Sequence, residues 1–259
     1  MAFSDAAAAF AYLESFTNFE KVTPQSVREY KLERMHLLLE LFGNPHHSYR
    51  CIHIAGSKGK GSTAAFLASM FTAAGFSTGL YASPHVVSYK ERMTVDGEQL
   101  DDALCITIIE EIQRLIESQK IQPLFSMEGP TTFELLTLLA FLSFQRKGCS
   151  WAVVETGIGG RLDATNVIHP EASVLTPVEK EHTDILGETI EEIASEKAGI
   201  IKQSTPVYCG YQYDTVKKIF RDTASSRNAP FSLLEEYLDS YTVARSEHGM
   251  SVHYMWRNR

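Results

Sequence analysis

The sequence predicts an α/β fold in which a doubly wound, mostly parallel sheet is flanked by helices. Three observations indicate this class: short apolar runs alternate with longer helix-like segments, the runs at 151–154 and 173–175 are continuously apolar, and a glycine-rich turn joins a strand to a helix. Continuous apolar runs are typical of parallel strands that helices cover on both faces. No repeat, low-complexity tract or linker divides the chain, so residues 1–259 are expected to form a single domain.

The first half of the chain alternates helices, strands and turns. Its expected elements are, in order, helices at 6–16 and 26–42, a strand at 51–55, a helix at 62–74, a strand at 80–82, a hairpin at 93–99 and a helix at 101–118. Gly43-Asn44-Pro45 ends the second helix and Gly75 the third, because glycine and proline interrupt helices. The hairpin is indicated by its Asp96-Gly97 turn.

The second half continues the same alternation. Its expected elements are, in order, a helix at 131–147, strands at 151–154 and 173–175, a helix at 189–201, a strand at 207–209, a helix at 213–227 and a closing hairpin of strands 241–243 and 251–254. The helix at 131–147 is apolar almost all round and is expected to be buried. Thr189 and Glu192 form a capping box at the start of the next helix. Strands that alternate with helices predict βαβ crossovers and therefore a parallel sheet.

Composition and charge narrow the function classes. The formal net charge of −8 argues against nucleic acid or an acidic membrane as a partner, although a local cluster of cations and backbone N–H groups can still bind a small anion. The most apolar stretch, residues 135–144, is too short to cross a bilayer, and Lys21 is the first basic residue, so no signal peptide is indicated. The four cysteines form no CxxC pair. We therefore expect a cytoplasmic protein with small-molecule partners.

The segment Gly56-Ser57-Lys58-Gly59-Lys60-Gly61-Ser62-Thr63 has the features of a phosphate-binding loop. It lies between an apolar strand and a helix, where glycines let backbone N–H groups converge on phosphate oxygens and the helix N-terminus adds positive charge. The spacing differs from the usual Walker A motif, because a glycine follows the second lysine, and a plain glycine-rich turn is the alternative. The expected nucleotide-binding residues are Gly56, Gly59, Lys60, Gly61, Ser62 and Thr63.

A carboxylate and a histidine follow two of the predicted strands. Glu155 ends the strand at 151–154, and His182 lies a few residues beyond the strand at 173–175, so both are expected at the carboxyl edge of the sheet with the phosphate loop. A carboxylate at that position is a typical Mg²⁺ ligand. Each also has an ordinary interpretation: Glu155 as a strand-end residue beside a flexible loop, and His182 as an exposed or hydrogen-bonded histidine. Taken alone, Ser83 and Lys197 would be a turn residue and a solvated helix lysine.

Several segments together resemble, in the same order along the chain, the folylpolyglutamate synthase and dihydrofolate synthase family, a branch of the Mur-type ligases. The resemblance rests on segments 56–63, 82–85, 91–92, 131–134, 155–166, 181–183, 186–187 and 196–202, of which 155–166 is the most specific. It extends from the first predicted helix to about Cys209. It implies a fold like the central domain of the Mur ligases, with a variant phosphate loop.

The resemblance implies an ADP-forming amide ligase. In this family ATP phosphorylates a substrate carboxylate, and the amine of glutamate attacks the acyl phosphate, with tetrahydrofolate, dihydropteroate or both as substrate. It implies a catalytic role for Lys60, His182 and Lys197, and two Mg²⁺ ions held by Ser83, Glu155, His182 and a carbamylated Lys197. The segments that it implies as pterin contacts contain Thr131, Thr132, Phe133, Glu134, Leu162, Asp163 and Ala164. For Phe133, a core position is an equally good interpretation.

The sequence departs from the family pattern in two local segments and in length. Ser57-Lys58 stands where the family usually has Thr-Asn, and Glu179-Lys180-Glu181 where it usually has a small residue, an apolar residue and Asp. Family members are longer and carry a C-terminal domain that helps to bind glutamate, which we expect residues 1–259 to lack. One alternative is therefore a nucleotide- or folate-binding module that needs a partner chain for turnover. Another is a different Mur-type ligase, against which segments 131–134 and 155–166 argue.

Overall fold

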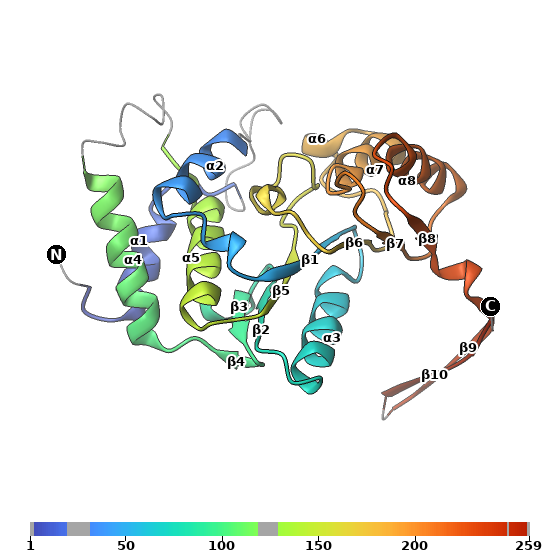
Figure 1. Cartoon of the computed structure of the whole chain (residues 1–259), viewed down its shortest axis with the longest axis horizontal. Helices are drawn as coiled ribbons and strands as arrows, with labels where there is room; N and C mark the ends of the chain where they lie inside the picture. The colour runs from blue at the N-terminus through green and yellow to red at the C-terminus, as the bar shows by residue number, and fades with distance from the viewer. Residues whose placement is uncertain (1–2, 20–31, 119–128, 248, 258–259) are drawn as a thin grey trace.

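The computed structural model describes residues 3–19, 32–118, 129–247 and 249–257, and its centre is an eight-stranded sheet (Figure 1). The strands are β1 (Arg50–Ala55), β2 (Thr78–Tyr81), β3 (Met93–Val95), β4 (Glu98–Gln99), β5 (Trp151–Glu155), β6 (Ala172–Leu175), β7 (Val207–Cys209) and β8 (Phe231–Leu233). Their order is β4-β3-β2-β5-β1-β6-β7-β8. Every neighbouring pair from β2 to β8 is parallel, whereas β3 pairs antiparallel with β2 and β4. The predicted α/β class with a mostly parallel sheet is confirmed.

Successive side chains of the central strands face two different cores, because strand residues alternate between the faces of a sheet. Ile52 and Ile54 of β1 and Val153 of β5 pack against Ala64 and Ala68 of helix α3 (Lys60–Ala73). The small alanine side chains let α3 lie close to the sheet. Since α3 directly follows β1 in the chain, this packing fixes the glycine-rich turn between them.

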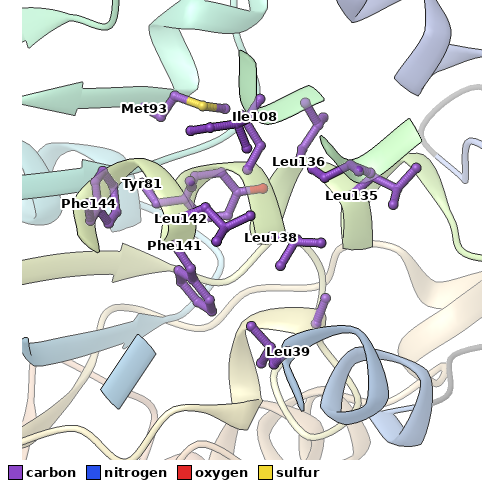
Figure 2. Close-up of a cluster of buried hydrophobic side chains, with 14 of the residues drawn as sticks. Leu39, Tyr81, Met93, Ile108, Leu135, Leu136, Leu138, Phe141, Leu142 and Phe144 are labelled. Atoms are coloured by element: carbon purple, nitrogen blue, oxygen red, sulfur yellow. The ribbon is translucent and has the colours of Figure 1, made fainter. Parts of the chain in front are cut away.

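The opposite face carries the largest core. Four helices contribute to it: α1 (Ala6–Glu14), α2 (Leu32–Leu41), α4 (Asp102–Glu117) and α5 (Thr132–Arg146). Figure 2 draws Leu39 of α2, Ile108 of α4 and Leu138 of α5 in this core, together with Tyr81 of β2 and Met93 of β3. α5 is buried along almost its whole length, as its apolar sequence predicts. Truncation of one of its buried leucines to alanine should destabilise the fold by about 2–5 kcal/mol.

A third core lies beside β6 and β7. It involves the helices α6 (Thr183–Leu186), α7 (Ile190–Ala198) and α8 (Asp214–Ser226). Leu175 of β6 packs in this core together with Ile193 of α7 and Phe220 of α8. The predicted capping box is confirmed: the Glu192 N–H donates to Thr189 Oγ1 at 3.2 Å, and the Thr189 N–H donates to the Glu192 carboxylate at 3.0 Å.

The last two strands, β9 (Leu238–Ser246) and β10 (Gly249–Trp256), form an antiparallel hairpin that extends away from the sheet (Figure 1). It confirms the predicted closing hairpin and is longer than the sequence indicated. Short 3₁₀ helices complete the fold: η2 (Pro45–His47), η3 (Tyr89–Arg92), η4 (Ala164–Val167) and η5 (Leu234–Glu236). Within the described ranges, no helix combines the length and the apolar character needed to cross a membrane.

Several predicted boundaries were wrong. The helix expected from residue 62 begins at Lys60, so its first turn belongs to the glycine-rich segment. The strand expected at 80–82 is Thr78–Tyr81, because pairing with β5 begins at Thr78. The helix expected to reach residue 201 ends at Ala198. β8 and α6 were not predicted, and residues 26–31 of the second expected helix lie outside the described residues.

Candidate active site

Four loops meet at the carboxyl edge of the sheet. They follow the adjacent parallel strands β2, β5, β1 and β6. The connection from β1 through α3 to β2 runs in one direction along the sheet, and the connection from β5 to β6 runs in the opposite direction. The direction of the crossovers therefore reverses at the adjacent strands β5 and β1. In α/β sheets, such a switch point opens a crevice in which ligands bind.

The glycine-rich segment has a backbone that depends on glycine. Gly56 has a φ of 151°, and a Cβ added there would lie 1.9 Å from Thr176 Oγ1. Gly59 has a φ of 78° and precedes α3 without a side-chain cap, which leaves the N–H groups of the first helical turn for another acceptor. The Ser57 and Lys58 N–H groups donate to the Pro177 carbonyl at 2.9 and 3.1 Å, and this anchors the segment to the loop after β6. The geometry suits a phosphate group.

Lys60 and Glu155 face each other at this edge. Lys60 Nζ lies 4.0 Å from Glu155 Oε1, and the Ser83 N–H donates to Glu155 Oε2 at 3.2 Å. The Glu155 side chain is only 3% exposed. Burial raises its pKa to about 7, although Lys60 and the Ser83 N–H act in the opposite direction. A desolvated carboxylate beside the glycine-rich segment is a suitable Mg²⁺ ligand, so these residues fit that ion.

Lys197 is buried beneath the glycine-rich segment, and its interpretation as a solvated helix lysine is therefore wrong. Its side chain is 1% exposed. Its Nζ donates to the Gly56 carbonyl at 2.9 Å and to Glu181 Oε1 at 2.6 Å. Burial lowers the pKa of Lys197, whereas the bond to Glu181 raises it. The hydrogen bond to the Gly56 carbonyl connects α7 to the backbone that precedes Lys60, and the ion pair with Glu181 connects it to the loop after β6.

His182 immediately precedes α6, with a left-handed backbone (φ 46°). It lines the same cavity as Lys60 and Ser83. Within the residues that the structure describes, no group of three or more His, Cys, Asp or Glu side chains is arranged to hold a metal ion. Mg²⁺ at Glu155 and His182 would therefore take further oxygen ligands from a hydroxyl, water or phosphate.

A cavity of about 650 Å³ opens next to the glycine-rich segment, which is a common size for small-molecule sites. Nine of the predicted site residues line it: Lys60, Ser83, Thr131, Phe133, Glu134, Leu162, Asp163, Ala164 and His182. The other predicted site residues do not line it: Gly56, Gly59, Gly61, Ser62, Thr63, Thr132, Glu155 and Lys197. The structure thus gathers the expected pterin segments in one cavity, and Lys60 belongs both to this cavity and to the glycine-rich segment.

Residues 131–134 have structural partners that the sequence analysis missed. Thr131 and Glu134 form a capping box at the start of α5, and Glu134 Oε1 accepts from Arg34 Nε at 3.1 Å. Burial raises the pKa of Glu134 despite this ion pair. Thr132 Oγ1 donates to the Leu13 carbonyl at 3.0 Å. The T-x-x-E pattern of a capping box was available in the sequence. Phe133 lines the cavity, with its ring 6.0 Å from that of Tyr81.

The loop after β5 folds around Asp163. Asp163 Oδ2 accepts the N–H groups of Gly157 and Ile158 at 2.9 and 3.0 Å, and its Oδ1 accepts the Thr165 N–H at 2.9 Å. Phe133 packs against this loop, because a Cβ added to Gly157 would lie 2.6 Å from Phe133 Cζ. The Asp163 carboxylate therefore fixes the backbone that forms one wall of the cavity.

Arg92 and His85 also line the cavity, and the sequence analysis assigned them no role. Arg92 is 1% exposed, and its Nε donates to His85 Nδ1 at 2.8 Å. Nearby, the Glu91 carboxylate accepts the N–H groups of Val86, Val87 and Ser88 and so shapes the loop after β2. His85 and Arg92 lie in segments 82–85 and 91–92, on which the family resemblance rests. That resemblance was the signal in the sequence that could have pointed to these two residues.

The chain matches one protein family over most of its length and is similar to individual proteins of known name. The Mur ligase middle domain family matches residues 54–255. The dihydrofolate synthase/folylpolyglutamate synthase of Bacillus subtilis is 37% identical over 206 residues, which are 79% of this chain and 47% of that protein. The chain thus spans about half the length of this relative.

Solved structures of folylpolyglutamate synthase (FPGS) are similar in fold. The Mycobacterium tuberculosis enzyme in complex with ADP has a TM-score of 0.81 and 33% identity, over 93% of this chain and 54% of that one. An FPGS complex with AMPPCP and folate has a TM-score of 0.83 and 30% identity, over 95% of this chain and 60% of that one. The similarity covers nearly all of this chain and little more than half of each neighbour.

Proposed function

This chain belongs to the Mur ligase family through its middle domain, and on that premise we propose that residues 1–259 act as the ATP-binding domain of a folylpolyglutamate synthase or dihydrofolate synthase. The observation that carries the proposal is the position of Lys60, which belongs both to the phosphate-binding segment and to the cavity. A phosphoryl group on the segment and a substrate in the cavity would meet at this side chain. The names and ligands of the relatives support the same activity.

In the proposed reaction, glutamate is joined through an amide bond to the carboxylate of tetrahydrofolate or dihydropteroate, and ATP is converted to ADP and phosphate. An oxygen of that carboxylate attacks the γ-phosphorus, ADP leaves, and the amine of glutamate then displaces phosphate from the acyl carbon to form the amide. Lys60 and the N-terminus of α3 would attract the phosphoryl group and reduce the repulsion between the two anions. Gly56, Gly59, Gly61, Ser62 and Thr63 would form the rest of the phosphate site.

Magnesium would be held by Ser83, Glu155, His182 and Lys197. Bound there, Mg²⁺ would neutralise part of the negative charge of ATP and of the substrate carboxylate. The support for Glu155 is its burial beside Lys60. For Ser83, it is the N–H that donates to the Glu155 carboxylate. His182 shares a cavity with Ser83 and Lys60.

Lys197 would act as a carbamate in this proposal. Its neutral amine would add to the carbon of CO₂ with loss of a proton, which would convert a cation into an oxygen ligand. Burial supports this, because it favours the neutral amine, whereas the ion pair with Glu181 stabilises the ammonium form. Intact mass spectrometry of the chain in bicarbonate buffer tests the carbamate: an added CO₂ on wild type and none on Lys197→Arg is expected, and an unmodified wild type refutes it.

The cavity would hold the pterin. Phe133 offers an aromatic ring to a flat heterocycle, and Leu162 and Ala164 offer apolar contact. Because Thr131, Thr132, Glu134 and Asp163 already have hydrogen bonds within the protein, we propose that these four hold the walls and that Phe133 and Leu162 contact the ring. Both tetrahydrofolate and dihydropteroate carry the ring that this site would recognise.

Turnover is proposed to need further protein, because the chain spans about half the length of its relatives. A partner chain, or a second domain on the same polypeptide, would bind glutamate and close over the acyl phosphate. Binding of nucleotide and pterin without turnover is the second candidate. The four cysteines are all buried and unpaired, which supports a reducing, cytoplasmic setting.

An ADP-release assay tests the function. The purified chain is mixed with ATP, Mg²⁺, glutamate and either dihydropteroate or tetrahydrofolate, with Lys60→Ala as the matched control. Release that requires both the pterin and glutamate supports the ligase and names its substrate. Binding of ATP and pterin without release supports the binding module. A chain that binds neither contradicts the proposal.

A further inference from the structure

A buried chain of hydrogen bonds connects the central strand to the cavity wall. His53 of β1 lies on the face of the sheet away from α3, because its neighbours Ile52 and Ile54 pack against that helix. His53 Nε2 is 2.9 Å from Thr165 Oγ1, and Thr165 Oγ1 donates to Asp163 Oδ1. The other oxygen of Asp163 accepts the N–H groups of Gly157 and Ile158. The chain thus runs from the sheet to the loop after β5.

The direction of each hydrogen bond in this chain is fixed. A carboxylate only accepts, so the Thr165 hydroxyl proton is directed to Asp163. The oxygen of that hydroxyl must then accept from His53, which makes Nε2 the protonated nitrogen of the ring. Nδ1 is buried without a hydrogen-bond partner among the described residues. His53 therefore serves as a neutral donor with a single defined tautomer.

The three side chains are enclosed by protein. His53 and Thr165 are both 0% exposed, and Asp163 is 4% exposed. In such surroundings an unsatisfied hydrogen-bonding group is strongly unfavourable, so loss of one member should disturb the next. The four donors around Asp163 (two from the loop, two from Thr165) satisfy both of its oxygens. Asp163 is therefore bound from within the protein and is held in one orientation.

We propose that His53 and Thr165 are positioning residues for the pterin: through Asp163 they hold the Gly157–Ile158 backbone and, with it, the wall against which Phe133 packs. This rests on the proposed function of the cavity. Neither residue lines the cavity, so each acts through Asp163 rather than on the ligand. The effect should fall on pterin binding, because the phosphate-binding segment is anchored separately to the loop after β6.

Matched variants at Thr165 test the proposal. Thr165→Val keeps the shape of the side chain and removes the hydroxyl, whereas Thr165→Ser keeps the hydroxyl. We expect Thr165→Val to accelerate amide hydrogen exchange at Gly157 and Ile158 in the ligand-free protein and to weaken dihydropteroate or tetrahydrofolate binding by about tenfold or more in calorimetry. Binding of MgATP should change by less than about twofold. Thr165→Ser should restore both properties, and Thr223→Val on α8 should leave them at the wild-type level.

Variants at His53 complete the test. His53→Gln keeps an N–H near the position of Nε2 and should retain most of the pterin affinity, whereas His53→Leu should lower it as Thr165→Val does. The double variant should lose little more than either single variant, because both interrupt the same chain. Unchanged exchange and unchanged pterin affinity in Thr165→Val, or an equal loss of pterin and MgATP binding, would overturn the proposal. If the wild type binds no pterin, the proposed function fails, and exchange at Gly157 and Ile158 alone decides the positioning role.

Discussion

Lys60 Nζ and Glu155 Oε1 lie 4.0 Å apart, so the cation at the start of α3 faces the carboxylate at the end of β5. The separation is longer than a hydrogen bond, and each group therefore keeps capacity for a further partner. Burial also makes Glu155 harder to ionise, since it raises the pKa of this carboxyl to about 7 even with Lys60 nearby. A phosphate on Lys60 and a divalent cation on Glu155 would satisfy both groups at once.

Lys60→Ala should abolish measurable ATP binding in calorimetry. Lys60 is a cation at the start of α3, so its loss removes the side chain that is proposed to face the phosphates and leaves Glu155 without the positive charge 4.0 Å away. Lys58→Ala is the matched control: this lysine is exposed in the same segment and should matter much less. Equal affinity in wild type and Lys60→Ala would refute the phosphate site.

Glu155→Ala and His182→Ala should each remove the increase in nucleotide affinity that Mg²⁺ produces. The reason is that each substitution removes a proposed oxygen or nitrogen ligand of Mg²⁺ from the edge of the sheet where the phosphates would lie. The measurement is the ATP dissociation constant with Mg²⁺ and with EDTA. Glu98→Ala, an exposed carboxylate on β4, should retain the full Mg²⁺ effect. A retained effect in Glu155→Ala would assign that residue a structural role.

Much of the fold was predictable because its signals are local. Apolar runs, glycine breaks and the capping box at Thr189 indicated most helices and strands. β8 was missed because only its pairing with β7 distinguishes Phe231–Leu233 from a loop. The start of α3 was misplaced because Lys60 and Gly61 lie within a glycine-rich segment, where helix propensity is low, and packing against β1 and β5 compensates for it.

The sequence predicted many of the residues of the site, but few of the hydrogen bonds and ion pairs between them. The motifs singled out Phe133, Leu162 and His182, and in the structure all three line one cavity. The partners of Lys197 and Asp163 could not be read from the sequence, because Gly56 and Thr165 meet them only through tertiary packing. The side chains that fix the backbone therefore became visible only in three dimensions.

Gly157→Ala should weaken pterin binding by about tenfold. A Cβ at this position would lie 2.6 Å from Phe133 Cζ, so the phenylalanine ring must turn away from its place in the cavity. Calorimetric titration with dihydropteroate or tetrahydrofolate measures the effect. The same substitution in a Phe133→Leu background should cost less affinity than in wild type, because the smaller side chain leaves room for the methyl group. An equal loss in both backgrounds would show that the contact does not matter.

His53 should make the fold less stable in acid. Burial, with a smaller contribution from Lys202, lowers the pKa of His53 to about 3 from an ordinary value of 6.5. Below pH 6.5 the unfolded chain therefore binds a proton that the folded chain does not. The free energy of unfolding therefore decreases as the pH is lowered. The slope reaches about 1.4 kcal/mol per pH unit only well below pH 6.5, so wild type should lose about 2 kcal/mol more than His53→Gln between pH 6.5 and 4.5.

Urea unfolding at a series of pH values measures this difference. Subtraction of the His53→Gln curve from the wild-type curve removes the contributions of other buried groups, including Glu155, whose raised pKa acts in the opposite direction. His253→Gln provides the matched control, because His253 is exposed on the β9–β10 hairpin and its loss should leave the slope unchanged. Parallel curves for wild type and His53→Gln would mean that His53 accepts a proton in the folded protein. Its Nδ1 would then have a hydrogen-bond acceptor, and the fixed tautomer on which the His53–Thr165–Asp163 chain depends would be lost.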